Sequence, residues 1–154
     1  MLKRLTIQNF ALISSLDVSF CDGLNVLTGE TGAGKSIVLD ALSAVLGGKA
    51  DVEMIRAGEN RAVIEATFQY TSIRAAMNEY LDAGDLLDEP EDDEIVLSRE
   101  IRTTGRSSAR VNGRAVTQAI IREIGGFLVD IHGQSDHLSL LTRSEEHTSE
   151  LQSR

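Results

Sequence analysis

The sequence predicts an α/β domain with a mixed β-sheet, and three observations lead to that fold class. Segments in which apolar and polar residues alternate, as in half-exposed strands, recur along the chain. Stretches with a helical spacing of apolar residues lie between them. A glycine-rich loop at residues 29–36 follows a short apolar segment and precedes a helical one. With 154 residues, 42% of them hydrophobic and 25% charged, the chain has the size and composition of one folded domain.

Three strands and a helix are expected in the amino-terminal third. Residues 2–10 are rich in strand-forming residues, and residues 16–20 alternate between apolar and polar side chains. The mostly apolar segment Leu24 to Thr28 predicts a buried strand. Residues 36–46 predict a helix that is apolar nearly all round and therefore covered on most sides, and two glycines after Leu46 end it.

Strands and helices continue to alternate in the rest of the chain. Asn112 followed by Gly113 is the strongest hairpin signal, and Thr117 is expected to cap a short isoleucine-rich helix. In chain order we expect a strand at 62–70, a helix at 72–83, a strand at 94–101, the hairpin at 108–116, the capped helix, and a buried strand from Phe127 to Ile131.

The net charge of −9 would by itself argue against a nucleic-acid partner, but the charge is local. Residues 82–94 contain eight acidic residues and no basic one. They also contain Gly84 and Pro90, so we expect a solvated loop that repulsion keeps extended. A calcium site is the alternative, although the spacing lacks the calcium-loop pattern. Apart from this segment the chain is close to neutral.

Five arginines follow the acidic segment at intervals of three or four residues. They are Arg99, Arg102, Arg106, Arg110 and Arg114. Glu100 is the only acidic residue among them. The glycine, serine and threonine residues among them favour two strands or a ragged hairpin over a helix. The segment from Arg99 to Arg114 either faces water and neutralises the acidic loop, or contacts phosphates. The second reading would make the chain a DNA-binding module.

The sequence also indicates a compartment. Cys21 is the single cysteine, which fits a reducing cytosol. No apolar run approaches the ~20 residues of a membrane-spanning helix, and no apolar core of a secretory signal follows the first basic residues. We therefore expect a cytoplasmic protein with no membrane partner.

The glycine-rich loop contains the residues that predict a ligand. It matches G-x-x-x-x-G-K-[ST] at every fixed position, and its residues are Gly29, Glu30, Thr31, Gly32, Ala33, Gly34, Lys35 and Ser36. Its glycines let the backbone approach a phosphate so that successive N–H groups point at the anion. Lys35 adds charge for the β- and γ-phosphates, and the Ser36 hydroxyl is a magnesium ligand. The loop, with the adjoining Ile37, predicts binding of a nucleotide with Mg²⁺.

Hydrolysis needs a further group near the magnesium ion. Asp130, at the end of the predicted strand, is one candidate acid, and a chain that used it would be a stand-alone P-loop kinase or GTPase. We favour Gln134, whose carbonyl can reach both magnesium and the γ-phosphate from just beyond that strand. His132 and His137 flank it, and we expect them to pack in the loop or lie at the surface.

Beyond the loop, several stretches resemble the RecN family of bacterial DNA repair proteins, which are relatives of the SMC proteins with an ABC-type ATPase head. The glycine-rich loop is shared by many families, whereas its combination with the other stretches is more specific. The resemblance covers nearly all of residues 1–141, and its matching stretches are 5–13, 23–37, 55–58, 105–113 and 130–137.

The resemblance implies that residues 1–142 form the amino-terminal ATP-binding lobe of such a head, with Lys35 and Gln134 in catalytic roles and with Ser36 and Gln134 at the metal. It also implies ATP and Mg²⁺ as cofactors. The expected partners are a carboxy-terminal lobe, a second head in a homodimer, and DNA, in double-strand-break repair and recombination at the bacterial nucleoid. The signature motif and the paired acids of that family do not occur in this sequence. The resemblance therefore implies an ATPase only for the intact protein, of which this chain would be about a quarter.

The last segment stands apart from the rest. Residues 143–154 show no apolar periodicity, and from Arg143 to Ser153 they resemble the translation of a sequencing-library adapter. We expect this tail to be an assembly artefact and leave it out of the predicted lobe.

Overall fold

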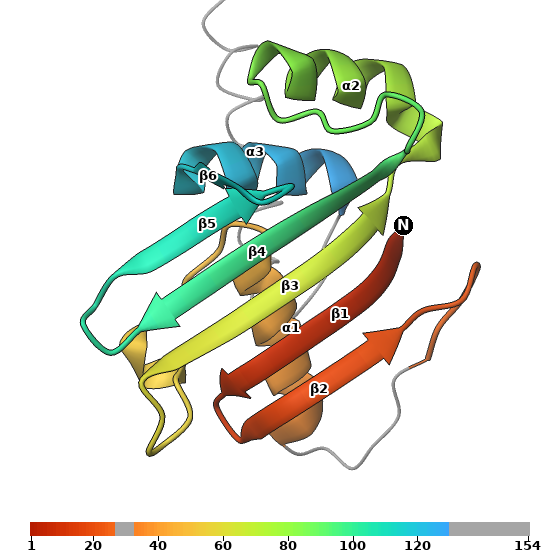
Figure 1. Ribbon diagram of the computed structural model, residues 1–154. Helices are drawn as coiled ribbons and strands as arrows, with labels where there is room; N and C mark the ends of the chain where they lie inside the picture. Colours follow the sequence, from red (N-terminus) through yellow and green to blue (C-terminus); the bar gives the residue numbers. More distant parts are fainter. Residues whose placement is uncertain (27–32, 130–154) are drawn as a thin grey trace, which may run out of the picture.

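The structure, a computed structural model, describes residues 1–26 and 33–129 (Figure 1). Strands and helices alternate along these residues. The strands are β1 (Leu2–Phe10), β2 (Ile13–Ser19), β3 (Arg61–Gln69), β4 (Glu94–Arg102), β5 (Ser107–Val111) and β6 (Arg114–Val116). The helices are α1 (Ala33–Val45), α2 (Arg74–Ala83) and α3 (Gln118–Leu128), with short 3₁₀ turns η1 (Val52–Met54) and η2 (Thr71–Ile73).

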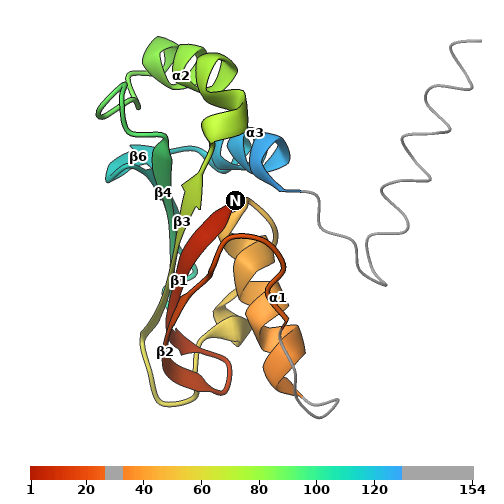
Figure 2. The same cartoon turned by 90° about the vertical axis from the view of Figure 1, so that its right-hand side faces the viewer.

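The six strands form one sheet in the order β2-β1-β3-β4-β5-β6. Each of its neighbouring pairs is antiparallel, so the parallel part of the expected mixed sheet does not lie among the described residues. Helices α1 and α3 lie on one side of the sheet, as the edge-on view in Figure 2 shows. The sheet therefore has an inner face toward these helices and an outer face on the opposite side. The expected combination of helices and sheet is confirmed.

The core joins the inner face of the sheet to α1 and to buried residues of α2 and α3. On β3 every second residue is buried, which is the alternation that predicted this strand. Helix α1 buries Ile37, Ala41, Ala44 and Val45, which share one face at a spacing of four, three and one. Its other side is not covered by the described residues, since Leu39 is 52% exposed. The expectation that α1 is covered on most sides is therefore wrong for this part of the chain.

The buried strand expected from Leu24 to Thr28 is not formed in its described part. Leu24 and Val26 lie outside any strand and are 91% and 72% exposed. The Asn25 side chain accepts a hydrogen bond from the Cys21 N–H (3.0 Å) and donates one to the Cys21 carbonyl (2.7 Å). Such bonds between a side chain and the backbone compete with strand formation and turn the chain. Leu27 and Thr28 lie outside the described residues.

The strand expected from Phe127 to Ile131 is also wrong in its described part. Phe127 and Leu128 belong to α3, which continues through Gly125 and Gly126. Phe127 is 54% exposed, and its ring lies 5.8 Å from that of Tyr80 on α2. The glycine pair lies within the helix, and Gly125 allows close packing: a Cβ there would lie 2.6 Å from the Leu46 carbonyl oxygen.

Local signals predicted the β5–β6 hairpin and the start of α3 correctly. Asn112 (φ 49°) and Gly113 (φ 78°) both adopt the left-handed conformation that a tight hairpin turn requires. The Thr117 side chain accepts a hydrogen bond from the Ile120 N–H (3.3 Å) and so caps α3. Ile121 and Ile124 are buried, as their helical spacing predicted.

The acidic segment is anchored to the body by two of its carboxylates. Asp93 accepts a hydrogen bond from the Thr71 hydroxyl and pairs with Arg74 (3.1 Å). The Thr71 bond, and then those of Arg74 and Gln69, lower the pKa of Asp93 to about 2. Asp88 pairs with Arg114 (3.1 Å). Most of the acidic side chains are exposed, as expected for a solvated loop, but these contacts also tie the segment to η2, α2 and β6.

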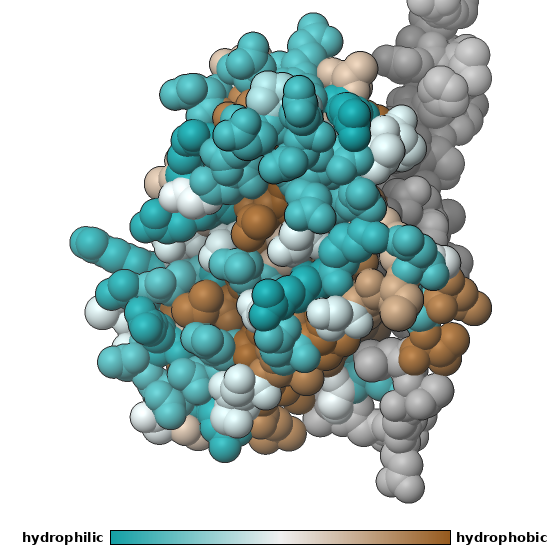
Figure 3. All heavy atoms as spheres, turned by 45° about the vertical axis from the view of Figure 1, so that its right-hand side comes forward, coloured by the Kyte–Doolittle hydropathy of each residue, from teal (hydrophilic) through white to brown (hydrophobic). Residues whose placement is uncertain are grey.

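Hydrophobic side chains reach the surface in places. Figure 3 shows them gathered in the lower part of that view, next to the grey residues, whereas the upper part is mostly hydrophilic. None of the described helices is long and apolar enough to cross a membrane.

Candidate functional site

Helix α1 begins within the glycine-rich loop and carries its last residues. Gly34, Lys35, Ser36 and Ile37 lie in the first turns of α1, and Ala33 is its first residue. Ser36 is exposed, Lys35 is half-buried, and Ile37 is buried in the core. Gly29, Glu30, Thr31 and Gly32 lie outside the described residues, as do Asp130, His132, Gln134 and His137. The structure thus brings together the lysine and serine of the predicted site and leaves the predicted glutamine untested.

The start of α1 has the properties of an anion site. The first N–H groups of a helix have no carbonyl partner within it, and the helix dipole places partial positive charge there. The first turn of α1 contains no acidic residue that would compete for these groups. A Cβ added at Gly34 would meet no atom of the described residues within 4 Å, so the backbone is open to a ligand on this side. A phosphate group and its magnesium ion fit this donor set, with N–H groups and Lys35 for the anion and the Ser36 hydroxyl for the metal.

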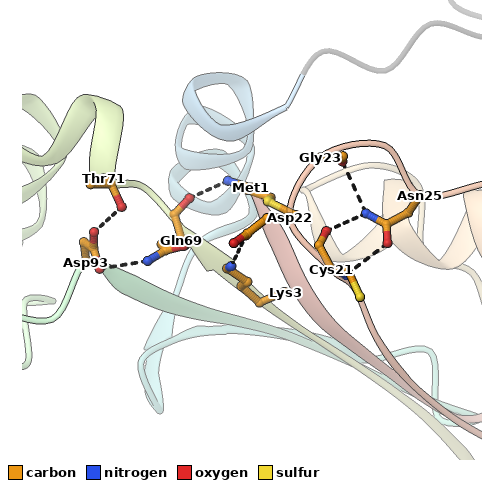
Figure 4. A network of polar contacts seen from close by, with 9 residues as sticks. All are labelled: Met1, Lys3, Cys21, Asp22, Gly23, Asn25, Gln69, Thr71 and Asp93. Atoms are coloured by element: carbon orange, nitrogen blue, oxygen red, sulfur yellow. Dashed lines mark hydrogen bonds and ion pairs between the residues drawn. The ribbon is translucent and has the colours of Figure 1, made fainter.

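The segment that leads into the loop is held in place by polar contacts (Figure 4). Asn25 folds back on Cys21, as described above, and also donates to the Gly23 carbonyl (3.4 Å). Lys3 on β1 pairs with Asp22 (2.6 Å) and ties this turn to the sheet. These contacts fix where the chain leaves the sheet just before the glycine-rich loop.

The far end of α1 is held by three side chains that sequence reasoning did not single out as structural. The buried Arg99 donates to the Ala44 carbonyl (3.3 Å), and Gln118 (3.0 Å) and Arg122 (3.3 Å) donate to the Gly47 carbonyl. Positive charge near the last carbonyls of a helix is favourable. Burial lowers the pKa of Arg99, and the nearby charge of Arg122 lowers it further. Because α1 is fixed at this end by α3 and β4, the orientation of its first turn is fixed as well.

The arginines between Arg99 and Arg114 have different roles in the structure. Arg99 is 2% exposed and bonds to Ala44 and to the Ser107 hydroxyl (2.9 Å), so its suggested role in phosphate contact is corrected to one in packing. Arg114 pairs with Asp88, which confirms for this residue the alternative that it neutralises the acidic loop. Arg102, Arg106 and Arg110 are exposed. No signal in the sequence alone separates Arg99 from these three, other than its position among the apolar residues of β4.

No group of three or more histidine, cysteine, aspartate or glutamate side chains that could hold a metal ion occurs in the described part of the chain. The acidic segment accordingly offers no calcium site there. Its carboxylates are instead engaged with Thr71, Arg74 and Arg114 or exposed.

Comparisons with known proteins place the chain in a family. A family model described as the RecF/RecN/SMC N terminal domain matches residues 1–139. Two similar proteins are called DNA repair protein RecN. The one from Bacillus subtilis is 49% identical over 148 residues, and the one from Halalkalibacterium halodurans is 48% identical over 149. They match 96% and 97% of this chain but only 25% and 26% of their own lengths. The chain thus spans about a quarter of these relatives.

Two solved structures with the same fold come from SMC proteins. One, described as "Structural biochemistry of ATP-driven dimerization and DNA stimulated activation of SMC ATPases", is 25% identical with a TM-score of 0.66 and covers 91% of this chain and 90% of its own. The SMC head domain from Thermotoga maritima is 26% identical with a TM-score of 0.60 and covers 80% of this chain and 41% of its own. The expected resemblance to RecN and the P-loop ATPase head fold are confirmed. The chain therefore belongs to the RecF/RecN/SMC N-terminal domain family, as a relative of the RecN proteins of bacterial DNA repair.

Proposed function

We propose that this chain is the ATP-binding amino-terminal lobe of a RecN-like ATPase that acts in DNA double-strand-break repair and recombination. The observation that carries the proposal is the first turn of α1, which is free of acidic residues and open at Gly34 and which holds Lys35 and Ser36 together. In this arrangement the N–H groups of residues 29–36 bind the phosphates, Lys35 neutralises the β- and γ-phosphates, and Ser36 ligates Mg²⁺. Gln134 completes the metal site and orients the γ-phosphate.

The complete site requires further parts of the protein. Leu24 and Val26, in the segment before the glycine-rich loop, and Leu39, on the outer side of α1, are largely exposed apolar residues. Exposed apolar side chains of this kind favour contact with a partner surface. We assign that surface to a carboxy-terminal lobe of the same protein. A second head then closes over the nucleotide in a homodimer, and the assembly engages DNA in the cytoplasm at the nucleoid.

Hydrolysis by the 154-residue chain alone is expected to be slow. The sequence has no apolar run that ends in an acidic pair and no signature motif, so the groups that activate water and complete the site in trans are missing from it. The chain should therefore bind ATP without efficient turnover.

The binding of fluorescent ATP to the whole chain, with and without Mg²⁺, tests the proposal. Lys35→Ala should weaken binding at least about tenfold, because it removes charge-assisted hydrogen bonds worth roughly 1.5–3 kcal/mol. Lys49→Ala is the matched control, since Lys49 lies in the loop after α1 and pairs with Asp51 (3.0 Å). Ser36→Ala should reduce the gain in affinity that Mg²⁺ gives. Equal affinity of Lys35→Ala and wild type would refute the proposal.

A second pair of variants separates this reading from a stand-alone kinase or GTPase. Gln134→Ala should reduce the Mg²⁺-dependent affinity, whereas Asp130→Ala should not. The opposite result would favour the stand-alone enzyme that uses Asp130 as its magnesium acid.

A further inference from the structure

We propose that the outer face of the sheet at the β4–β5 turn binds the phosphodiester backbone of DNA independently of base sequence. This inference deepens the DNA engagement proposed above and rests on it. The face contains a recess of about 790 Å³, which we call the arginine recess. Its lining includes three guanidinium groups and two available hydroxyl groups, from Arg102, Arg106, Arg110, Thr104 and Ser108. Ser107 also lines it, but its hydroxyl is engaged with the inward-facing Arg99 (2.9 Å).

The strand register explains why these side chains meet. Arg99 on β4 is buried toward α1, so its neighbour Glu100 points to the outer face. Ser108 lies opposite Glu100, and Arg110 lies opposite Ser98, which is two residues earlier on the same side of β4. Arg102 at the end of β4 has the same orientation as Glu100. The strand register thus gathers these side chains on the outer face of the sheet, the side opposite α1 and α3 in Figure 2.

Another arginine extends the positive surface across the sheet. Arg61 at the start of β3 is the direct cross-strand partner of Arg102, and both are exposed. Like charges directly opposite each other destabilise a sheet. This arrangement therefore does not serve the stability of the fold, and an external anion would relieve the repulsion.

Little negative charge within the protein offsets these arginines. Glu100 is the one carboxylate in the recess lining, and it pairs with Arg102. Among the described residues, no carboxylate forms an ion pair with Arg61, Arg106 or Arg110. The recess thus keeps a net positive charge although the chain as a whole carries −9.

The chemistry of the lining selects a phosphate backbone. Arginine forks and hydroxyl groups bind phosphate oxygens well. The lining has no aromatic side chain on which a base could stack and no amide side chain that could read a base edge. Residues on one side of a strand repeat at about 6.7 Å, so the Cα atoms of Arg106 and Arg110 lie roughly 13 Å apart and their side chains can contact successive phosphates of one backbone. The geometry therefore fits a polyanion, read through its backbone alone.

The test measures the affinity of the whole chain for labelled DNA duplexes of two unrelated sequences by fluorescence anisotropy, over a series of salt concentrations. Arg106→Gln should weaken binding about eightfold at ~0.1 M salt and lower the slope of log affinity against log salt by about 0.9, as for one lost phosphate contact. The change should be the same for both sequences. Arg4→Gln is the matched control: it removes one charge on the outer face, but Arg4 is already paired with Asp17 (2.6 Å).

A variant that removes a negative charge from the recess provides a second test. Glu100→Gln frees Arg102 and removes the carboxylate of the recess, so it should tighten DNA binding. Glu65→Gln makes the same change of charge on the same face, on β3 opposite Ser98, and should have less effect. Equal effects of the two glutamate variants, or of Arg106→Gln and Arg4→Gln, would show a response to net charge only and overturn the proposal.

The outcomes separate this inference from the proposed function. DNA binding by the wild type that the recess variants leave unchanged would refute the recess and preserve DNA engagement. Absence of DNA binding by the wild type would refute both. Displacement of DNA by inorganic phosphate at equal concentration would indicate a site for a single anion and overturn the proposal. Affinity for ATP should be unchanged in Arg106→Gln, and DNA binding without ATP should be unchanged in Lys35→Ala, so failure of the nucleotide site would be recognised separately.

Discussion

Replacing Gly125 with alanine tests the contact that joins α3 to the end of α1. A Cβ at this position would lie 2.6 Å from the Leu46 carbonyl oxygen and 3.2 Å from the Leu46 Cβ. The backbone there has little freedom to move away, because Gln118 and Arg122 hold the carbonyl of the next residue, Gly47. Overpacking of this kind costs roughly 1–3 kcal/mol, and a contact with backbone belongs at the upper end. The gain in helix propensity returns at most about 1 kcal/mol, so we expect a net loss of about 2 kcal/mol.

Gly126 provides the matched control one residue along the same helix. It is exposed, and a Cβ there would meet nothing within 4 Å. Gly126→Ala should therefore stabilise the protein by about 0.5–1 kcal/mol through propensity alone. The two variants have the same composition and differ only in which side of α3 carries the added methyl group.

Urea unfolding of the whole chain, followed by far-UV circular dichroism, measures the difference. With a denaturant slope of about 2 kcal/mol/M, the midpoints of the two variants should differ by roughly 1–1.5 M. A Gly125→Ala variant as stable as Gly126→Ala would mean that α3 does not pack on the end of α1 as described. The proposed anchoring of α1 would then be wrong as well.

Three further changes probe the hairpin, the helix cap and the acidic segment. Asn112→Ala should destabilise by about 2–3 kcal/mol in urea unfolding, because it removes bonds to the Val96 N–H (3.0 Å) and the Leu86 carbonyl (2.9 Å) and places alanine at a φ of 49°. Thr117→Ala should cost about 0.5–2 kcal/mol through loss of the cap of α3, whereas Thr117→Ser should cost less. The lowered pKa of Asp93 means that its ionised form stabilises the fold above the ordinary aspartate pKa and that this contribution is lost as pH falls toward about 2. Thermal unfolding of Asp93→Asn should therefore differ from wild type near neutral pH and converge with it between about pH 4 and 2; a constant difference would contradict this origin.

Much of the fold was predictable because its signals are local. Alternation identified β2 and β3, strand-forming residues identified β1, and turn and cap residues identified the β5–β6 hairpin and the start of α3. The errors came from short apolar runs, which cannot distinguish a buried strand from other structures by periodicity. The run after Gly126 continues a helix, and the run that begins at Leu24 is turned by the side chain of Asn25.

The candidate nucleotide site stays a prediction, and it too rests on local signals, since its lysine, serine and glycines are consecutive and the physics of a helix start needs only neighbouring residues. The arginine recess was predictable only in part. The sequence shows a row of arginines, but which of them are exposed depends on the strand register and on α1. Arg99 is buried because its position faces the helix, and Arg61 joins the row only because β3 pairs with β4.

By itself the sequence determined the helix that starts in the glycine-rich loop, the tight turn at Asn112 and the cap at Thr117, because each depends on backbone conformation and hydrogen bonds within a few residues. Only the tertiary structure decided that Arg99 serves packing, that Gly125 is a contact point and that Arg61 and Arg102 face each other. These outcomes depend on which distant segments are brought together, and that is determined by burial of the whole core rather than by any local pattern.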